Sequence, residues 1–160
     1  MKQNKLIILM GISGSGKSTF ARDYVSKNSG TRVINQDSIR RELTGNISDQ
    51  SKNREVIAEA KRRLDECLSN KESVIWDNTS LNLKYLNEIY LKTPEDYTVD
   101  IYYTERSFYP MECIASIHEE IENGVDRSKV PDHIVEKQYT RFIDTMKLLC
   151  KSVISIPVFR

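Results

Sequence analysis

The residues most suggestive of chemistry form one glycine-rich segment near the start of the chain. Residues 11–19 read Gly-Ile-Ser-Gly-Ser-Gly-Lys-Ser-Thr, which matches the phosphate-binding pattern G-x-x-x-x-G-K-[ST]. Gly11, Gly14 and Gly16 allow backbone conformations closed to residues with a side chain, so that consecutive N–H groups can surround a phosphate. A helix expected to begin near Lys17 adds the positive end of its dipole. The segment predicts binding of a nucleoside triphosphate.

The side chains of this segment have separate expected roles. Lys17 would reach the β- and γ-phosphates, and Ser18 would ligate the Mg²⁺ that bridges them. Thr19 would support the helix start or the nearby phosphates. A plain glycine-rich turn is the alternative, but the apolar run at residues 5–10 supplies the buried strand that the motif requires. We therefore expect a nucleoside triphosphate site formed by Gly11, Ser13, Gly14, Ser15, Gly16, Lys17, Ser18 and Thr19.

A carboxylate and a guanidinium follow the next expected strand, residues 31–35. Asp37 and Arg40 are three residues apart, which on a helix puts both on one face. A carboxylate there can orient an alcohol and take its proton as the γ-phosphoryl group departs, while Arg40 can hold an anion on the acceptor. Asp37 can also be a simple N-cap for a helix over residues 38–43, and the two roles are compatible.

A third strand, residues 73–76, delivers Asp77, Asn78 and Thr79 to the same edge of the expected sheet. Asp77 resembles the second acidic motif of phosphate-loop enzymes and can bind a metal-bound water. Pairing with Arg40, or a structural role as a turn or cap residue, is equally compatible with the sequence. We expect Asp77, Asn78 and Thr79 to lie with Asp37 and Arg40 on the acceptor side.

A polar stretch at residues 123–131, between two helical patterns, has the composition of a mobile lid. Its Arg127, helped by Lys129, can swing onto the triphosphate and neutralise the charge that develops during transfer. An exposed loop with ordinary surface charge is the alternative. Arg127 therefore joins Lys17 and Asp37 as a candidate catalytic residue.

The elements that must position these groups alternate along the chain. Apolar patterns and turn signals predict an α/β fold with a mostly parallel sheet of about five strands, helices on both faces and a helical lid. Ligands bind such sheets beyond the carboxyl ends of the strands. Ser51 and Asp132 are expected to cap two of the helices. The expected strands are 5–10, 31–35, 73–76, 97–103 and 153–159, and the longer helices are 17–27, 52–69, a stretch after 83, 111–122 and one after 132.

Length and composition bound the class of protein. The 160 residues, 29% of them charged, suit one soluble domain over residues 1–160, with a lid at about 106–131. A net charge of +1 argues against a protein that grips long duplexes, and the start of the chain resembles a first strand rather than a signal peptide, so we expect a cytoplasmic protein without a membrane segment. Cys67, Cys113 and Cys150 are expected to be buried apolar residues, without a disulfide or zinc site.

Taken together, these motifs resemble the 5′-hydroxyl polynucleotide kinases of phages and bacterial RNA-repair systems. The resemblance spans most of the chain and is carried by residues 11–19, the block 35–40, Asp77-Asn78-Thr79 with Leu81-Asn82, and Val130-Pro131 after the basic lid.

The resemblance implies a phosphate-loop kinase fold and transfer of the ATP γ-phosphate to the 5′-OH end of RNA or DNA. It implies that Lys17 and Ser18 form the ATP–metal site, that Asp37 is the general base, that Arg40 holds the phosphate next to the acceptor nucleoside, and that Asp77 supports the acceptor side. It also implies Arg127 as the lid arginine, but residues 117–123 lack the Arg-Asn pair that usually ends the helix before the lid, so Arg106 is a competing cation. Any repair ligase or phosphatase is expected to be a separate protein.

Two other functions fit the same residues. A small-molecule kinase, acting on a nucleoside or sugar-type alcohol, would use the same loop and acid. A nucleotide-binding module without transfer activity would need the loop but neither Asp37 nor Arg40.

Overall fold

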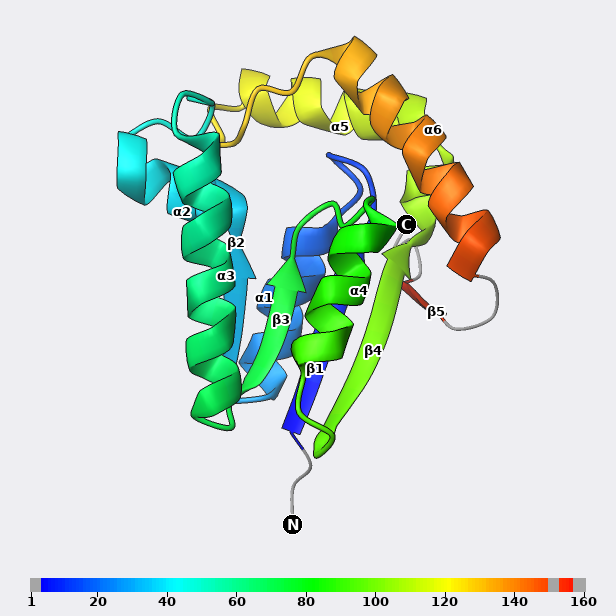
Figure 1. Cartoon of the computed structure of the whole chain (residues 1–160). Coiled ribbons are helices and arrows are strands. Elements are labelled where there is room, and N and C mark those ends of the chain that lie inside the picture. The colour runs from blue at the N-terminus through cyan, green and yellow to red at the C-terminus, as the bar shows by residue number, and fades with distance from the viewer. Residues whose placement is uncertain (1–3, 150–152, 157–160) are drawn as a thin grey trace.

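The computed structural model describes residues 4–149 and 153–156, in which strands alternate with helices (Figure 1). The strands are β1 (Asn4–Met10), β2 (Thr31–Asn35), β3 (Ser73–Asp77), β4 (Tyr97–Thr104) and β5 (Val153–Ile156). The helices are α1 (Lys17–Lys27), α2 (Gln36–Thr44), α3 (Asn53–Ser69), α4 (Leu83–Lys92), the short 3₁₀ helix η1 (Glu105–Phe108), α5 (Pro110–Glu122) and α6 (Asp132–Leu149). Residues 157–159 of the last predicted strand lie outside the described residues.

The strands form one five-stranded sheet in the order β2-β3-β1-β4-β5, and every neighbouring pair is parallel. Such an order places β1 at the centre, so the loop that leaves β1 emerges between the ends of β3 and β4. This confirms the predicted α/β fold with a mostly parallel sheet.

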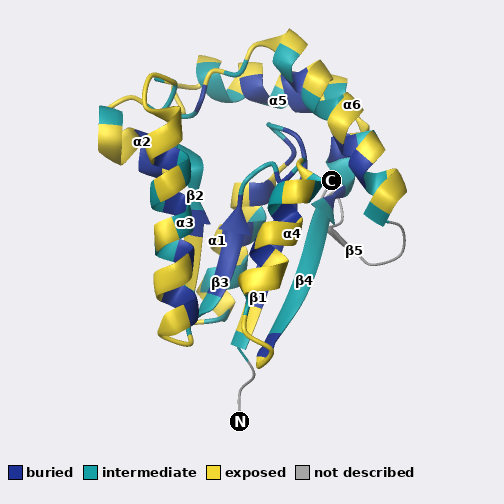
Figure 2. Ribbon diagram, viewed as in Figure 1, coloured by how far each residue is buried: buried dark blue, intermediate teal, exposed yellow. Residues whose placement is uncertain are grey.

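Helices cover both faces of the sheet because β1 alternates between them. Leu6 and Ile8 pack into one core with α2, α3 and α4, and Ile7 and Leu9 pack on the other face with α1. A strand buried on both faces needs a continuous apolar run, and residues 6–10 are all apolar and buried for this reason. β3 is buried in the same way (Figure 2).

A third cluster anchors α5 and α6 beside the end of β1. Met10 and Ile12 pack against Cys113 and Ile117 of α5 and against Phe142 of α6, all buried. In Figure 1, α5 and α6 rise beyond the end of β4 and arch over the loop that leaves β1. The described helices include none that is long and apolar enough to cross a lipid bilayer.

Two predicted helix caps are wrong. α3 begins at Asn53, and the cap position is occupied by Lys52, which makes no side-chain capping bond, rather than by Ser51. Asp132 is the first residue of α6 and not the residue before it, and its Oδ1 lies 2.8 Å from Nε2 of His118 on α5. The carboxylate of Asp132 thus joins two helices.

The burial of two cysteines gives a test of the core. Burial raises the pKa of Cys67 and of Cys113 to about 11, and both are buried as expected, whereas Cys150 lies outside the described residues. In a Cys150→Ser variant near pH 8, the thiolate fraction of each remaining thiol should be about one in a thousand. We expect Ellman's reagent to label neither thiol in the native protein and both in guanidinium. Rapid labelling of the native variant would contradict this packing.

Candidate active site

The glycine-rich loop after β1 needs its glycines for two different reasons. Gly14 and Gly16 have φ angles of +79° and +94°, in the left-handed region that favours glycine. Gly11 has no positive φ, so the predicted conformational reason is wrong for this residue. A Cβ at Gly11 would instead lie 2.2 Å from Oγ1 of Thr104, so it is space that excludes a side chain.

The start of the loop is fixed by hydrogen bonds to distant parts of the chain. The N–H of Gly11 donates to the Thr79 carbonyl at 3.0 Å, and the N–H of Ile12 donates to Oγ of Ser107 at 3.0 Å. Thr104 lies 2.6 Å from Ser107 and 2.7 Å from Ser15, oxygen to oxygen. Sequence reasoning missed Thr104 and Ser107, because a hydroxyl that supports a loop far away in sequence leaves no local pattern.

Lys17 lies at the base of this loop. Its side chain is buried and its Nζ donates to the Ile12 carbonyl at 2.9 Å. Burial lowers the pKa of Lys17, while the charge of Asp77 and, more weakly, that of Asp37 act in the opposite direction. Arg127 also contributes to lowering this pKa. Asp37 and Arg127, the other two predicted catalytic residues, therefore each lie within electrostatic range of Lys17.

Ser18 and Asp77 form the part of the site suited to a cation. Oγ of Ser18 donates to Oδ2 of Asp77 at 2.8 Å, and Oδ1 of Asp77 is buried with no hydrogen-bond partner in residues 4–149 or 153–156. A hydroxyl beside a carboxylate that has unused acceptor capacity is an oxygen donor set of the kind that Mg²⁺ prefers. Pairing of Asp77 with Arg40, one of the predicted alternatives, is not what the structure shows.

Asn35 joins the ends of β2 and β3. Its Oδ1 accepts from the N–H of Ser38 at 2.9 Å, and its Nδ2 donates to the carbonyl and to Oδ2 of Asp77 at 3.1 and 3.0 Å. The N-cap of α2 is therefore Asn35, and the alternative in which Asp37 caps this helix is wrong, because α2 begins at Gln36 and Asp37 lies in its first turn. Sequence reasoning assigned Asn35 no role, although asparagine after a strand is a known cap signal.

A second asparagine strengthens this junction. Oδ1 of Asn78 accepts from the N–H of Gln36 at 3.0 Å, while its Nδ2 is buried and has no partner within the described part of the chain. Asn78 therefore positions the first turn of α2 and keeps one donor available. Of the other predicted residues, Thr79 contributes its carbonyl to the loop, and the Thr19 hydroxyl accepts from Arg22 at 3.3 Å.

Asp37 and Arg40 form an ion pair on α2, with Nη1 of Arg40 donating to Oδ1 of Asp37. The Arg40 side chain is only 6% exposed, whereas that of Asp37 is 45% exposed and open to an approaching molecule. Nη2 of Arg40 reaches Oδ1 of Asn53 at 3.3 Å, and its Nε is buried with no hydrogen-bond partner among the residues that the structure describes. The pair thus combines an accessible carboxylate with a buried cation that has an unused donor within this part of the chain.

The predicted lid loop, residues 123–131, reaches across to the α2 side (Figure 1). Nη2 of Arg41 lies 2.8 Å from Oδ2 of Asp126, and the N–H of Lys129 donates to Oγ of Ser48 at 3.0 Å. Arg127 is 17% exposed and its Nη1 lies 2.6 Å from Oε2 of Glu120.

Arg106, the competing cation, lies in η1, where its carbonyl accepts from Sγ of Cys113 at 3.3 Å. The charge of Arg127 acts on the pKa of Lys17, and that of Arg106 acts on the pKa of Cys113, on which Lys17 also acts. Both arginines therefore stay candidates for the lid role.

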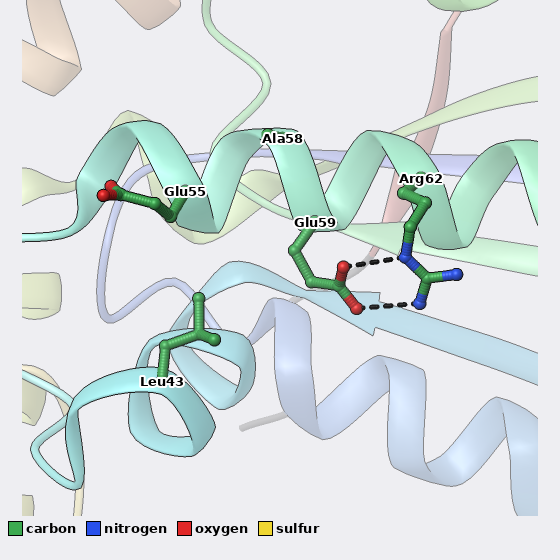
Figure 3. Close-up of a pocket in the computed structure, with 5 residues that line it drawn as sticks. All are labelled: Leu43, Glu55, Ala58, Glu59 and Arg62. Atoms are coloured by element: carbon green, nitrogen blue, oxygen red, sulfur yellow. Dashed lines mark hydrogen bonds and ion pairs between the residues drawn. The ribbon is translucent and has the colours of Figure 1, made fainter.

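A separate hollow of about 490 Å³ lies on the outer surface between α2 and α3 (Figure 3). Glu59 is held there by Arg62, with Oε2 and Nε 2.8 Å apart. No residue predicted for catalysis or binding lines it; the lining residues are Leu43, Glu55, Ala58, Glu59 and Arg62.

Comparison with known families agrees with this geometry. A family model described as an AAA domain matches residues 6–144, which is most of the chain. The chain belongs to this AAA-domain family. Its phosphate loop and parallel sheet give this family member a phosphate-loop kinase fold that binds ATP. No curated protein matches the sequence significantly.

Solved structures with the same fold act on different molecules. A chain of the Pnkp1/Rnl/Hen1 RNA repair complex aligns with a TM-score of 0.76 and 23% identity over 95% of this chain and 48% of its own. A gluconokinase from Sinorhizobium meliloti 1021 gives 0.63 and 17% identity, covering 100% and 86%. A deoxyadenosine kinase from M. mycoides gives 0.52 and 15%, covering 96% and 90%. This protein spans about half the length of the repair-complex chain.

The two asparagine caps allow a matched test of the junction between β2 and β3. Asn35 caps α2 at the site, whereas Asn82 caps α4 through a 3.2 Å bond from the N–H of Tyr85. Replacement of Asn82 by alanine should cost about 1 kcal/mol of unfolding free energy, measured by urea denaturation, and replacement of Asn35 should cost at least as much, because it also removes the two bonds to Asp77. We expect only Asn35→Ala to reduce ATP turnover as well, because only Asn35 also holds Asp77. Equal ATP turnover in both variants would show that Asn35 acts as a helix cap and does not position Asp77 for turnover.

Proposed function

We propose that this protein is an ATP- and Mg²⁺-dependent kinase that phosphorylates the 5′-OH end of RNA or DNA. The observation that carries the proposal is the Asp37–Arg40 pair, an exposed carboxylate joined to a buried guanidinium that keeps an unused N–H. A 5′-OH end offers both groups that such a pair can bind, a hydroxyl and an adjacent phosphate.

Each residue has one role in this reaction. Asp37 accepts the proton of the 5′-hydroxyl as its oxygen attacks the γ-phosphorus and the bond to the β-phosphate oxygen breaks. Arg40 holds the neighbouring phosphate of the acceptor, while Lys17 and Arg127 neutralise the charge on the transferred group. Ser18 would hold Mg²⁺ directly and Asp77 would hold it through a bound water; the ion would supply positive charge that offsets the charge of the triphosphate.

Some of the predicted residues contribute through their backbone. The amides of Gly14, Gly16, Lys17 and Ser18 lie where the loop turns into α1, at the positive end of the helix. Asn78 and Thr79 support the acceptor side through the contacts that they make with α2 and with the loop.

The burial of Arg40 favours a polynucleotide end over a neutral small alcohol. A buried cation with an unsatisfied donor is costly, and an anionic ligand removes that cost whereas a neutral sugar does not. The gluconokinase and deoxyadenosine kinase neighbours keep a small-molecule acceptor as the second candidate. The repair-complex neighbour supports the further proposal that this kinase works with a separate ligase or phosphatase.

The first experiment measures competition for [γ-³²P]ATP among 5′-OH RNA, 5′-OH DNA and free nucleosides. We expect label on the polynucleotides, and a 3′-phosphorylated nucleoside should be a much better acceptor than the plain nucleoside. In Arg40→Gln that preference should vanish, while Arg32→Gln, at the opposite end of the sheet, should keep it. Label on nucleosides or sugars alone would support the small-molecule kinase, and acceptor-independent hydrolysis alone would support the module without transfer.

The role of Asp37 is tested by replacing its side-chain carboxylate with an amide. Asp37→Asn should leave ADP binding intact and lower kcat by about 10²- to 10⁴-fold, because the amide cannot take the proton of the acceptor. Asp23→Asn, on the exposed surface of α1, is the matched control and should retain wild-type turnover. A normal kcat in the Asp37 variant would show that this carboxylate does not act as the base and that its role is the ion pair with Arg40.

A further inference from the structure

The first three donors of the phosphate loop are each bound by a different part of the protein. The backbone N–H groups of Gly11 and Ile12 donate to the Thr79 carbonyl and to the Ser107 hydroxyl. The N–H of Ser13 donates to Oε1 of Gln138 at 2.8 Å. Gln138 lies in the middle of α6, far from the loop in sequence. The N–H of Ser13, which the sequence assigned to ATP, is therefore already used by the protein.

Gln138 is a polar residue in an otherwise apolar stripe. It lies three residues after Val135 and four before Phe142, which are both fully buried against Ile12, so helical spacing puts all three on the inner face of α6. Lys137, one residue earlier, is exposed. A half-buried amide on such a face is costly unless it is hydrogen-bonded, and Ser13 supplies the partner.

We propose that Gln138 is a positioning residue that holds the first half of the phosphate loop in the conformation that binds nucleotide. By fixing Ser13, it places the following residue, Gly14, in the left-handed conformation from which the loop turns its remaining amides inward. The loop then pays less conformational entropy when the phosphates bind. This role depends on nucleotide binding alone and holds whatever the acceptor is.

The test measures equilibrium binding of a fluorescent N-methylanthraniloyl derivative of ADP, which needs no acceptor. Gln138→Met keeps the length of the side chain and removes the acceptor oxygen, and we expect the Kd to rise about fivefold, the effect of one lost hydrogen bond. The KM for ATP should rise in parallel while kcat changes little. Gln138→Ala, with the same expected direction, replaces the methionine variant if that protein does not fold.

Two controls separate positioning from the general docking of α6. Lys137→Met places a methionine on the exposed face of the same helical turn, and the Kd of this variant should equal that of the wild type. Thr145→Val removes the 3.4 Å bond from Oγ1 of Thr145 to the Leu81 carbonyl, so it should lower the melting temperature without changing the Kd more than twofold. An equal rise in Kd for Thr145→Val and Gln138→Met would overturn the proposal, as would an unchanged Kd in Gln138→Met. Tighter binding in Gln138→Met would also overturn it, because it would show that the amide competes with a phosphate.

Discussion

The carboxylate of Asp77 is the interaction on which the site depends. Its Oδ2 accepts from the hydroxyl of Ser18 at the start of α1 and from the amide of Asn35 at the end of β2. Because Asn35 also caps α2, one carboxylate relates the phosphate loop to the helix that carries Asp37 and Arg40. The donor and acceptor halves of the proposed site are therefore held in register by a short chain of hydrogen bonds, and the parallel sheet below supplies the rigid base.

The elements and the phosphate loop could be predicted because their signals are local. The apolar run of β1, the glycine spacing of the loop and the apolar stripe of α6 each lie within one continuous stretch of sequence. The residues that were missed act over long separations: 95 residues divide Ile12 from Ser107, and 125 divide Ser13 from Gln138. A lone serine or glutamine carries no pattern that names its distant partner.

The misplaced cap of α2 has a different cause. Asn35 and Asp37 are two positions apart, and both residue types favour the N-cap. Residue type alone therefore does not decide which of them caps α2. The structure decides through the backbone, since Asn35 is extended, with φ −124° and ψ 123°, and still paired in β2, while Asp37 is already helical. That shift frees the Asp37 carboxylate from capping and leaves it paired with Arg40.

The bridge between the loop 123–131 and the α2 side consists of few and exposed contacts. The side chains of Arg41 and Asp126 are 46% and 71% exposed, and an ion pair of this kind contributes about 0–1 kcal/mol. Its attraction is also screened by salt, because the Debye length is about 8 Å at physiological ionic strength. The Arg41–Asp126 pair therefore holds the loop to the α2 side only weakly, and this hold weakens further as the ionic strength rises.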